Sequence, residues 1–424
     1  MISNSIERIK DEVLRRIKPQ ESERIIIREI CDDIIASLKK ITDGEPVIAG
    51  SIAKDTFLSG DRDIDIFVLY DRDMSETEMR REIRGLGMRV FGTIEERYAQ
   101  HPYAHATYRG FEVDLVPAFR FSGRIKSSVD RTPEHTKFVL QHTDERMRDE
   151  IRILKQFAKG IGVYGAEARV QGLSGYLCEL LIIRFGGFET FLENVRDLGE
   201  DDVIGPDDLW EGERSALVFI DPVDPRRNVA AALSQTSLGL LKLAASEFLN
   251  NPRMGFFFPN PPNGGYPEDR ILAVDVSETI DMRVEDIYFP QLRKTAESIA
   301  RALEEYGVEK SAIYCDGKRA ILFFLLKRRA LESTKEHAGP PADMEKNAEE
   351  FLNKWGKERC YVRDGRLYAR IERDAVTPEQ TIEKAMIGLG RQMDRKKMRI
   401  LEEIPEETRS FLIREFSGKK PWEF

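Results

Sequence analysis

The sequence predicts an α+β protein built from several domains. Its 424 residues exceed the length at which a single hydrophobic core stops growing, so about two to four domains are expected. Strand-like alternation and helical spacing are mixed near both ends of the chain, whereas helical spacing dominates the middle. A segment rich in Asn and Pro, residues 250–267, marks the clearest boundary. We therefore predict three domains, with bounds 1–144, 145–255 and 256–424.

The first domain is predicted to combine helices with a mixed, largely antiparallel sheet. Apolar residues recur at helical spacing before Pro19, and a second helix is expected over 21–40; both helices should cover the sheet. A short helix is expected over 53–58. Ser75 and Glu78 form a capping box that opens a further helix. The strands are expected over residues 47–49, 64–69, 94–98, 104–108 and 111–117.

The middle domain is predicted to be mainly helical, and the last domain to be a small α+β region. In the last domain, helical spacing covers 292–306, Asp364-Gly365 is a strong hairpin signal, and Thr377 caps another helix. We expect this region to be RRM-like or ferredoxin-like, a common kind of RNA-binding scaffold. One helix of the middle domain should carry a basic face made of Arg148, Arg152, Lys155 and Lys159.

The composition is that of a globular protein with a heavily charged surface, because 41% of the residues are hydrophobic and 33% are charged. The longest apolar run, Ala320 to Leu326, is far shorter than the roughly 20 residues of a membrane helix, and no apolar signal region opens the chain. We expect a cytoplasmic protein without membrane contact. The four cysteines lie far apart, which favours reduced, buried thiols over a zinc site.

The charge distribution leaves RNA open as a partner. A net charge of −9 argues mildly against nucleic acid, because affinity for phosphate backbones comes mainly from clustered Lys and Arg. Such clusters are nevertheless present at 318–319, 327–329 and 395–399. Each cluster alone is more often a solvated face than a binding site, by roughly three to one.

The segment from Gly50 to Asp65 carries the strongest functional signal. Gly50 and Ser51 follow one predicted strand, and Asp63 and Asp65 lie at the start of the next apolar run. Because side chains in a strand alternate between faces, the two carboxylates project to the same side. They repel each other unless they are protonated or neutralised by cations, and hard oxygen ligands favour Mg²⁺. A metal site is the economical interpretation.

A third acid, Asp114, completes this predicted site from another short apolar strand. Carboxylates that hold Mg²⁺ can bind a triphosphate, lower the pKa of an attacking hydroxyl and steady the departing pyrophosphate. Gly50 lets the backbone approach phosphate oxygens, and amides after Ser51 could donate to them. Asp61 is also separated from Asp63 by one residue, but it lies in the turn before the strand, so we leave it out of the predicted metal site. For any single Asp a solvated strand edge is the better interpretation by roughly ten to one, but the combined pattern reverses those odds.

With these motifs the chain resembles the archaeal, class I CCA-adding enzymes, which are tRNA nucleotidyltransferases of the polymerase-β-like superfamily. The resemblance extends over most of the chain. The Gly-Ser pair and the acidic residues occur across the superfamily and identify only the chemistry. More specific matches lie in residues 129–133, 164–167, 172–180, 221–231 and 288–292.

The resemblance implies a reaction without a nucleic-acid template. The 3′-hydroxyl of an immature tRNA would attack the α-phosphate of CTP, twice, and then of ATP, and pyrophosphate would leave each time. It also implies that Mg²⁺ is held by Asp63, Asp65 and Asp114, and it leaves a homodimer open. The expected nucleotide-binding residues are Gly50, Ser51, Lys54, Thr132, His135, Arg152, Lys155, Tyr164 and Arg227.

Arg227 is expected to read the incoming base, with help from the phosphates of the tRNA. Cytosine at N3 and adenine at N1 both present an acceptor beside an amino donor, whereas uracil and guanine carry a proton at the corresponding nitrogen. A guanidinium only donates hydrogen bonds, so it favours the first pair and meets a donor in the second. Discrimination against such mismatched polar groups can be large.

Several of these residues have structural alternatives. His135 could be an ordinary surface histidine, Arg152 and Lys155 could be the solvated side of their helix, and Tyr164 could be a packing aromatic. For the glycines of 172–175 we prefer a structural role, the close approach of helices, to a functional one. For the whole chain, the alternatives are a poly(A) polymerase-like enzyme and an RNA-binding protein with an idle nucleotidyltransferase fold.

Overall fold

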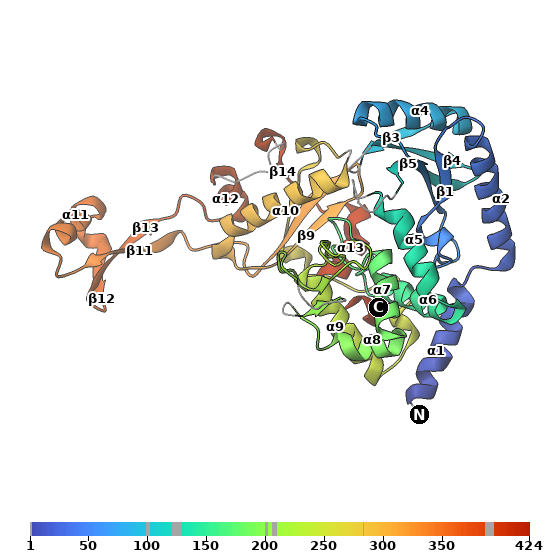
Figure 1. Cartoon of the computed structure of the whole chain (residues 1–424). Coiled ribbons are helices and arrows are strands. Elements are labelled where there is room, and N and C mark those ends of the chain that lie inside the picture. The colour runs from blue at the N-terminus through green and yellow to red at the C-terminus, as the bar shows by residue number, and fades with distance from the viewer. Residues whose placement is uncertain are drawn as a thin grey trace. The chain divides into compact units, whose positions relative to one another are not determined.

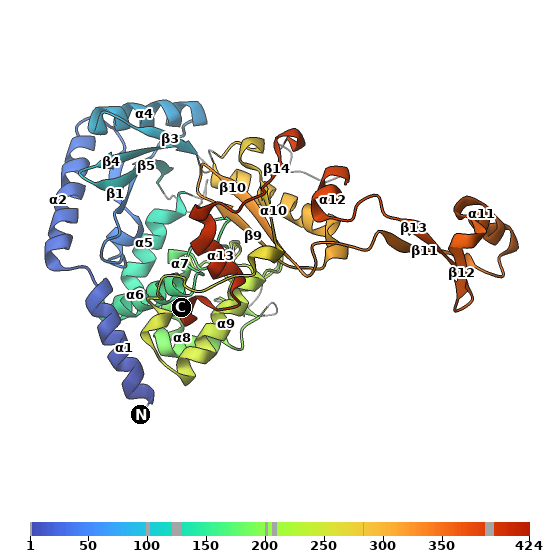
Figure 2. The same ribbon diagram turned by 180° about the vertical axis from the view of Figure 1, so that it is seen from behind.

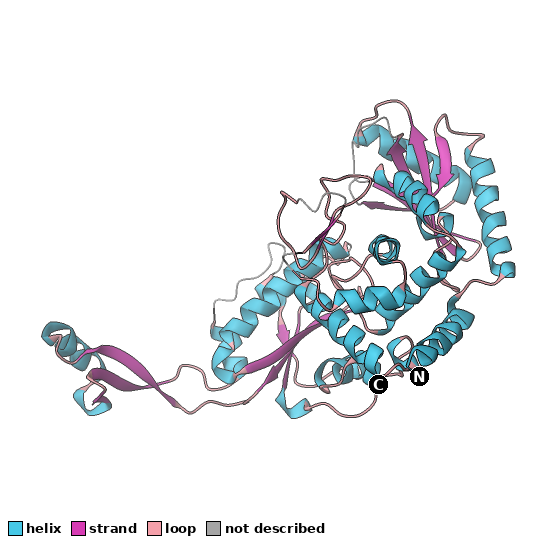
Figure 3. Cartoon of the chain, turned by 60° about the horizontal axis from the view of Figure 1, so that its bottom comes forward, coloured by secondary structure: helices cyan, strands magenta, loops and turns pink. Residues whose placement is uncertain are grey.

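The structure is a computed structural model, which describes residues 2–98, 102–120, 129–199, 202–205, 210–282, 284–385 and 394–424. The chain forms two compact units, one of Met1–Asn260 with Lys420–Phe424 and one of Pro261–Lys419. Figures 1 and 2 label their elements from opposite sides, and Figure 3 separates helices from strands by colour. Both units contain helices and strands, so the predicted α+β class is confirmed, while the predicted domain bounds stay predictions. No helix within these ranges is long and apolar enough to cross a membrane.

A five-stranded sheet in the first unit carries the predicted acidic residues. Its strand order is β1-β2-β5-β4-β3. β2 and β5 run parallel, and the other neighbours are antiparallel, which confirms the predicted mixed sheet. The strands span Glu45–Ile48 (β1), Asp63–Tyr70 (β2), Glu95–Tyr98 (β3), Pro102–Tyr108 (β4) and Phe111–Phe119 (β5).

Helices α2, Glu21–Leu38, and α4, Glu76–Phe91, cover one face of this sheet (Figures 1 and 2). α4 begins at the predicted capping box, in which the Ser75 hydroxyl accepts from the Glu78 N–H and the Glu78 carboxylate accepts from the Ser75 N–H. Because successive side chains of a strand face opposite sides, the acidic positions of β2 point away from both helices. The residues of β2 that pack under the helices are Ile64, Ile66, Val68 and Tyr70.

Two predictions for this unit are wrong. The sequence predicts that α1, Ile2–Ile17, covers the sheet, but its buried residues belong instead to the helical core described below. The short helix predicted over 53–58 is α3, Gly50–Ala53. The helix cannot continue through Asp55, whose φ is +52°, and the side chains of Lys54 and Thr56 on either side of it both bind Glu179.

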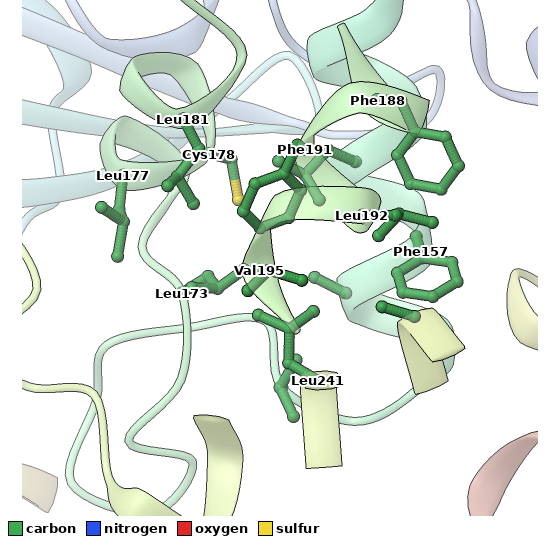
Figure 4. Packing of buried hydrophobic residues seen from close by; sticks show 14 of the residues in the cluster. Phe157, Leu173, Leu177, Cys178, Leu181, Phe188, Phe191, Leu192, Val195 and Leu241 are labelled. Atoms are coloured by element: carbon green, nitrogen blue, oxygen red, sulfur yellow. The ribbon is translucent and has the colours of Figure 1, made fainter. Parts of the chain in front are cut away.

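The other helices of the first unit enclose a large apolar core, part of which is drawn in Figure 4. Cys178 lies in this core among leucine and phenylalanine side chains, and burial raises the pKa of its thiol to about 12. All four cysteines are free thiols, as predicted, although Cys315 and Cys360 are only partly buried. The helices are α5, Arg131–His142, α6, Glu145–Gly160, α7, Gly175–Phe185, α8, Phe188–Val195, and α9, Gln235–Asn250; a parallel pair, β6, Val203–Ile204, and β7, Val218–Phe219, completes the unit.

The second unit contains two antiparallel sheets. The four-stranded sheet has the order β14-β8-β10-β9, and helix α10, Glu285–Ala302, connects β8 to β9. The predicted hairpin is present between β12 and β13, with positive φ at Asp364 and Gly365, and Thr377 caps α12, Pro378–Lys384, as predicted. The remaining elements are β8, Ile271–Asp275, β9, Val308–Cys315, β10, Ala320–Leu326, β11, Thr334–Pro341, α11, Glu345–Trp355, β12, Cys360–Arg363, β13, Arg366–Glu372, β14, Arg399–Ile400, and α13, Arg409–Phe416.

Candidate active site and its family

The three predicted carboxylates lie together at one edge of the five-stranded sheet. β2 and β5 are parallel neighbours, and their register places Asp65 beside Asp114 and Asp63 beside Glu112. Because alternate residues of a strand share a face, all four acids point to the same side. They line a pocket of about 320 Å³, to which His105 and Arg97 also contribute. The structure thus brings Asp63, Asp65 and Asp114 together, while their roles stay predictions.

The electrostatics of this pocket favour a cation. Burial raises the pKa of Asp65 to about 6, and the charges of Asp114 and Asp63 act in the same direction. Burial and neighbouring acids also raise the pKa of Asp63. A cation would relieve this repulsion, and carboxylate oxygens suit hard divalent ions. Among the described residues no group of three or more His, Cys, Asp or Glu side chains is already arranged to hold a metal ion.

Gly50 is required by the approach of Asp65 to the backbone. Its φ is +66°, and a Cβ at this position would lie 1.9 Å from Asp65 Oδ2. The sequence suggested that Gly50 lets the backbone approach a phosphate. The structure shows that it makes room for the carboxylate beside the first turn of α3, next to Ser51.

We expect Gly50→Ala to lower the rate of the nucleotide addition that the resemblance implies by about 10²-fold, because displacing a reacting group by 1 Å can have an effect of that size. Gly60→Ala is the matched control, since Gly60 also has a positive φ, +86°, but a Cβ there meets nothing within 4 Å. Both variants carry the same kind of backbone strain, about 1–3 kcal/mol. The measurement is single CMP addition beside thermal melting. Equal rates for the two variants would contradict the steric argument.

His105 is a residue of this site that the sequence interpretation missed. It lies on β4 directly beside Asp114, and its Nδ1 is 2.6 Å from Asp114 Oδ1. Its Nε2 is 2.9 Å from Glu112 Oε2. The sequence does place a histidine in the strand expected over 104–108. It does not show that this strand pairs with β5, and only that pairing puts His105 beside Asp114.

Lys54 and Lys155 converge on one buried carboxylate, that of Glu179 on α7. Lys54 Nζ lies 2.6 Å from Glu179 Oε2, and Lys155 Nζ lies 3.1 Å from Oε1. The Thr56 hydroxyl donates to the same Oε1 at 2.6 Å. Burial opposes ionisation of Glu179, but the two ammonium groups and these hydrogen bonds together hold its pKa at about 2. This Glu179 cluster, Lys54, Thr56, Lys155 and Glu179, ties the segment after α3 to α6 and α7.

Arg152 lies next to this cluster and is fully buried. Its guanidinium contacts Asp149 Oδ1 at 2.8 Å and Asp55 Oδ1 at 2.7 Å, and its Nε donates to the Phe57 carbonyl at 3.1 Å. The alternative in which Arg152 and Lys155 form a solvated helix face is therefore wrong. Their predicted contact with nucleotide stays a prediction.

The remaining predicted residues are positioned by α5, the loop 221–228 and the chain around residue 164. His135 is buried beside Asp221, so the surface-histidine alternative is wrong. Thr132 is partly buried in the first turn of α5. Tyr164 packs at the edge of the helical core with the Lys159 ammonium 5.3 Å from its ring centre. A Cβ at Gly172 would lie 2.0 Å from the Val163 carbonyl oxygen. Both residues lie between α6 and α7, so this glycine allows close contact of two backbone segments and not the predicted close approach of helices.

Arg227 lines a second pocket, of about 1,070 Å³, and forms an ion pair with Asp221 at 2.8 Å. About a third of its side chain, 35%, is exposed. Arg131 and Arg226 line the same pocket and both contact Asp224. The sequence predicted a role for Arg227 in reading the base but gave no residue of the protein as its partner.

Three family models match consecutive parts of the chain. A nucleotidyltransferase domain matches residues 28–142, the second domain of tRNA nucleotidyltransferase matches 149–258, and the C-terminal domain of the CCA-adding enzyme matches 271–402.

Curated relatives cover nearly the whole chain. The CCA-adding enzyme of Thermoplasma acidophilum is 37% identical, over 92% of this chain and 94% of its own. That of Thermoplasma volcanium is 35% identical, over 94% and 93%, and that of Methanosarcina barkeri is 35% identical, over 91% of both. With the acidic pocket in place on the sheet, the chain belongs to the archaeal CCA-adding enzymes, a family of tRNA nucleotidyltransferases.

Proposed function

We propose that the pocket of Asp63, Asp65 and Asp114 is where this CCA-adding enzyme joins CTP and ATP to the 3′ end of tRNA. In each step the 3′-hydroxyl oxygen of the tRNA bonds to the α-phosphorus of the nucleotide and loses its proton, and the bond to pyrophosphate breaks. The observation that carries the proposal is the register of β2 and β5, which places Asp65 beside Asp114 in one pocket.

Nucleotidyltransferases generally use divalent metal ions, and we assign Mg²⁺ to this pocket. Asp63, Asp65 and Asp114 would hold it, because they supply hard oxygen donors whose mutual repulsion a divalent cation relieves. When bound, the metal would lower the pKa of the tRNA hydroxyl and neutralise charge on the triphosphate. His105 would hold the Asp114 carboxylate in position through its ring nitrogen.

The nucleotide would lie between this pocket and Arg227. Arg227 is proposed to read the base. The residues proposed to bind or support the triphosphate and sugar are Ser51, Lys54, Thr132, His135, Arg152, Lys155 and Tyr164. The Glu179 cluster supports this assignment, since two lysines converge on one carboxylate, and burial together with the charge of Lys54 lowers the pKa of Lys155. An added phosphate would supply negative charge to this pair of lysines.

The second unit is proposed to bind tRNA on an RRM-like or ferredoxin-like scaffold. Its four-stranded antiparallel sheet, in which β8 and β10 are central and α10 crosses from β8 to β9, supports that description. We also propose that the enzyme acts in the cytoplasm, where its four free thiols would stay reduced. A homodimer stays a prediction.

The decisive test is product length on tRNA that lacks its terminal CCA. With radiolabelled CTP and ATP, we expect three added nucleotides and then a stop, and no incorporation of UTP or GTP. Long A tails on unrelated RNA would support the poly(A) polymerase-like alternative. tRNA binding without incorporation would support the RNA-binding alternative.

A further inference from the structure

Asp221 is the centre of a buried polar network to which the proposed function gives no role. Its side chain is fully buried. Oδ2 lies 2.9 Å from His135 Nε2 and 2.8 Å from Arg227 Nη1. Oδ1 accepts from the Tyr176 hydroxyl at 3.2 Å and from the Val223 N–H at 3.0 Å. Four donors from three parts of the chain thus surround one carboxylate.

The network also sets the hydrogen-bonding state of His135. Burial opposes ionisation of Asp221, but its donors, His135 first among them, hold its pKa at about 2, so it is a carboxylate that only accepts. His135 must therefore carry its proton on Nε2. The Tyr176 ring stacks on the imidazole, with ring centres 3.9 Å apart, and fixes its plane.

The backbone closes a turn around the pair of Asp221 and Arg227. The Asp221 N–H donates to the Arg227 carbonyl at 2.9 Å, and the Arg227 N–H donates to the Asp224 carbonyl at 2.9 Å. Asn228, the next residue, is anchored through its side chain to the Phe219 N–H. Both ends of the ion pair therefore start from a rigid backbone.

This arrangement limits the directions in which the Arg227 guanidinium can point. A free arginine side chain has many accessible rotamers, but its guanidinium is planar, so fixing one nitrogen restricts the positions of the others. Asp221 holds Nη1, while the exposed part of the side chain lines the second pocket. We infer that Asp221 is a positioning residue that aims Arg227 and thereby sets the selectivity for CTP and ATP over UTP and GTP. This inference rests on the proposed reading of the base by Arg227.

Asp221→Asn tests the inference, because the amide keeps the shape but places an N–H₂ group among N–H and O–H donors. Asp224→Asn is the matched control. Asp224 lies in the same turn and is also buried, but its carboxylate pairs with Arg131 and Arg226 and not with the Arg227 side chain. The assay is single-nucleotide addition to tRNA lacking CCA, with kcat and KM determined separately for CTP and UTP.

We expect Asp221→Asn to lower the ratio of kcat/KM for CTP to that for UTP by about tenfold or more, which corresponds to roughly 1.4 kcal/mol. Asp224→Asn should leave the ratio unchanged. Because both nucleotides are compared on one preparation, a loss of folded enzyme cancels from the ratio. If Asp221→Asn does not yield soluble protein, Asp221→Glu is compared with Asp224→Glu, and the first should show the lower ratio. An unchanged ratio in the Asp221 variants, or an equal loss in the Asp224 controls, overturns the inference.

Arg227→Ala separates this inference from the proposed function. If Arg227→Ala keeps wild-type selectivity, Arg227 does not read the base, and the proposed function fails at that point whatever Asp221 does. If Arg227→Ala loses selectivity while the Asp221 variants keep it, only the role of Asp221 is overturned. If Arg227→Ala and the Asp221 variants all lose selectivity while the Asp224 controls keep it, both the reading of the base by Arg227 and the role of Asp221 are supported.

Discussion

Replacing Asp65 with Asn is expected to lower the rate of CMP addition by about 10³-fold or more while tRNA binding persists. The loss follows from removing one negative donor from a site whose metal supplies several kcal/mol of transition-state stabilisation. Binding should persist because phosphate contacts elsewhere dominate affinity for RNA. The measurements are single-turnover CMP addition, tRNA binding by anisotropy, and divalent-ion binding by calorimetry.

The same substitution should make the metal-free protein more stable. The pKa of Asp65 in the folded protein, about 6, lies above its ordinary value of 3.8, so folding resists ionisation of this carboxyl. At pH 8 Asp65 is ionised in both states and this resistance is a free-energy cost, which Asn removes. We expect a higher melting temperature at pH 8 and a gain that fades as the pH falls from 6 through 3.8, because the carboxyl becomes protonated in both states only below that range. A purely structural Asp65 would show the opposite.

Asp61→Asn is the control from the same segment. Asp61 pairs with Lys159 at 3.1 Å, and both side chains are about one-third exposed. An exposed pair of this kind contributes about 0–1 kcal/mol, and Asp61 does not line the acidic pocket. Near-wild-type activity is expected. If Asp65→Asn keeps activity within tenfold of wild type, or if Asp61→Asn loses as much, the assignment of the metal site is wrong.

The acidic pocket was the part of the site that the sequence could predict, because it depends on local regularities. Alternation along a strand places Asp63 and Asp65 on one face whatever surrounds them. Asp114 could be added because it stands in a short apolar run of its own. The parallel pairing of β2 with β5 places Asp65 beside Asp114. No local pattern in the sequence specifies this pairing.

Arg152 and Lys155 show why the rest could not be predicted. Helical spacing correctly places them on the polar face of α6, and a polar face is usually solvated. Spacing does not say what covers a face, and here the segment after α3 and helix α7 cover it with carboxylates. The same limit applies to Asp221, whose partners His135 and Tyr176 lie far away in the sequence.

Glu179→Gln is expected to destabilise the protein by about 3–5 kcal/mol, more than Lys155→Met. Removing Glu179 leaves two buried ammonium groups facing each other without a carboxylate, whereas removing Lys155 leaves one ammonium, that of Lys54, on one carboxylate. Glu179→Gln should therefore lose more stability than Lys155→Met, because the cluster has two lysines but only one glutamate. Urea unfolding of both variants measures this difference, with Glu193→Gln, an exposed position on α8, as a control expected to change stability by less than about 0.5 kcal/mol.

The pH dependence of these curves tests the same point independently. Glu179 has a pKa of about 2 in the folded protein, below its ordinary value of 4.5, so its contribution to stability is present above pH 4.5 and is lost as the pH falls toward 2. The difference between wild type and Glu179→Gln should shrink over that window, while the Glu193→Gln curve follows wild type. A constant difference would mean that the loss comes from packing and not from charge.

The proposed binding of the triphosphate by the lysines of the Glu179 cluster predicts an effect of nucleotide on stability. A ligand that binds only the folded state stabilises it in proportion to the logarithm of its concentration over its Kd. If Lys155 contributes to binding of the triphosphate, saturating CTP should raise the melting temperature of wild type more than that of Lys155→Met. Equal shifts would show that the charge of Lys155 serves the fold alone, and the nucleotide-binding role of Lys155 would then be withdrawn.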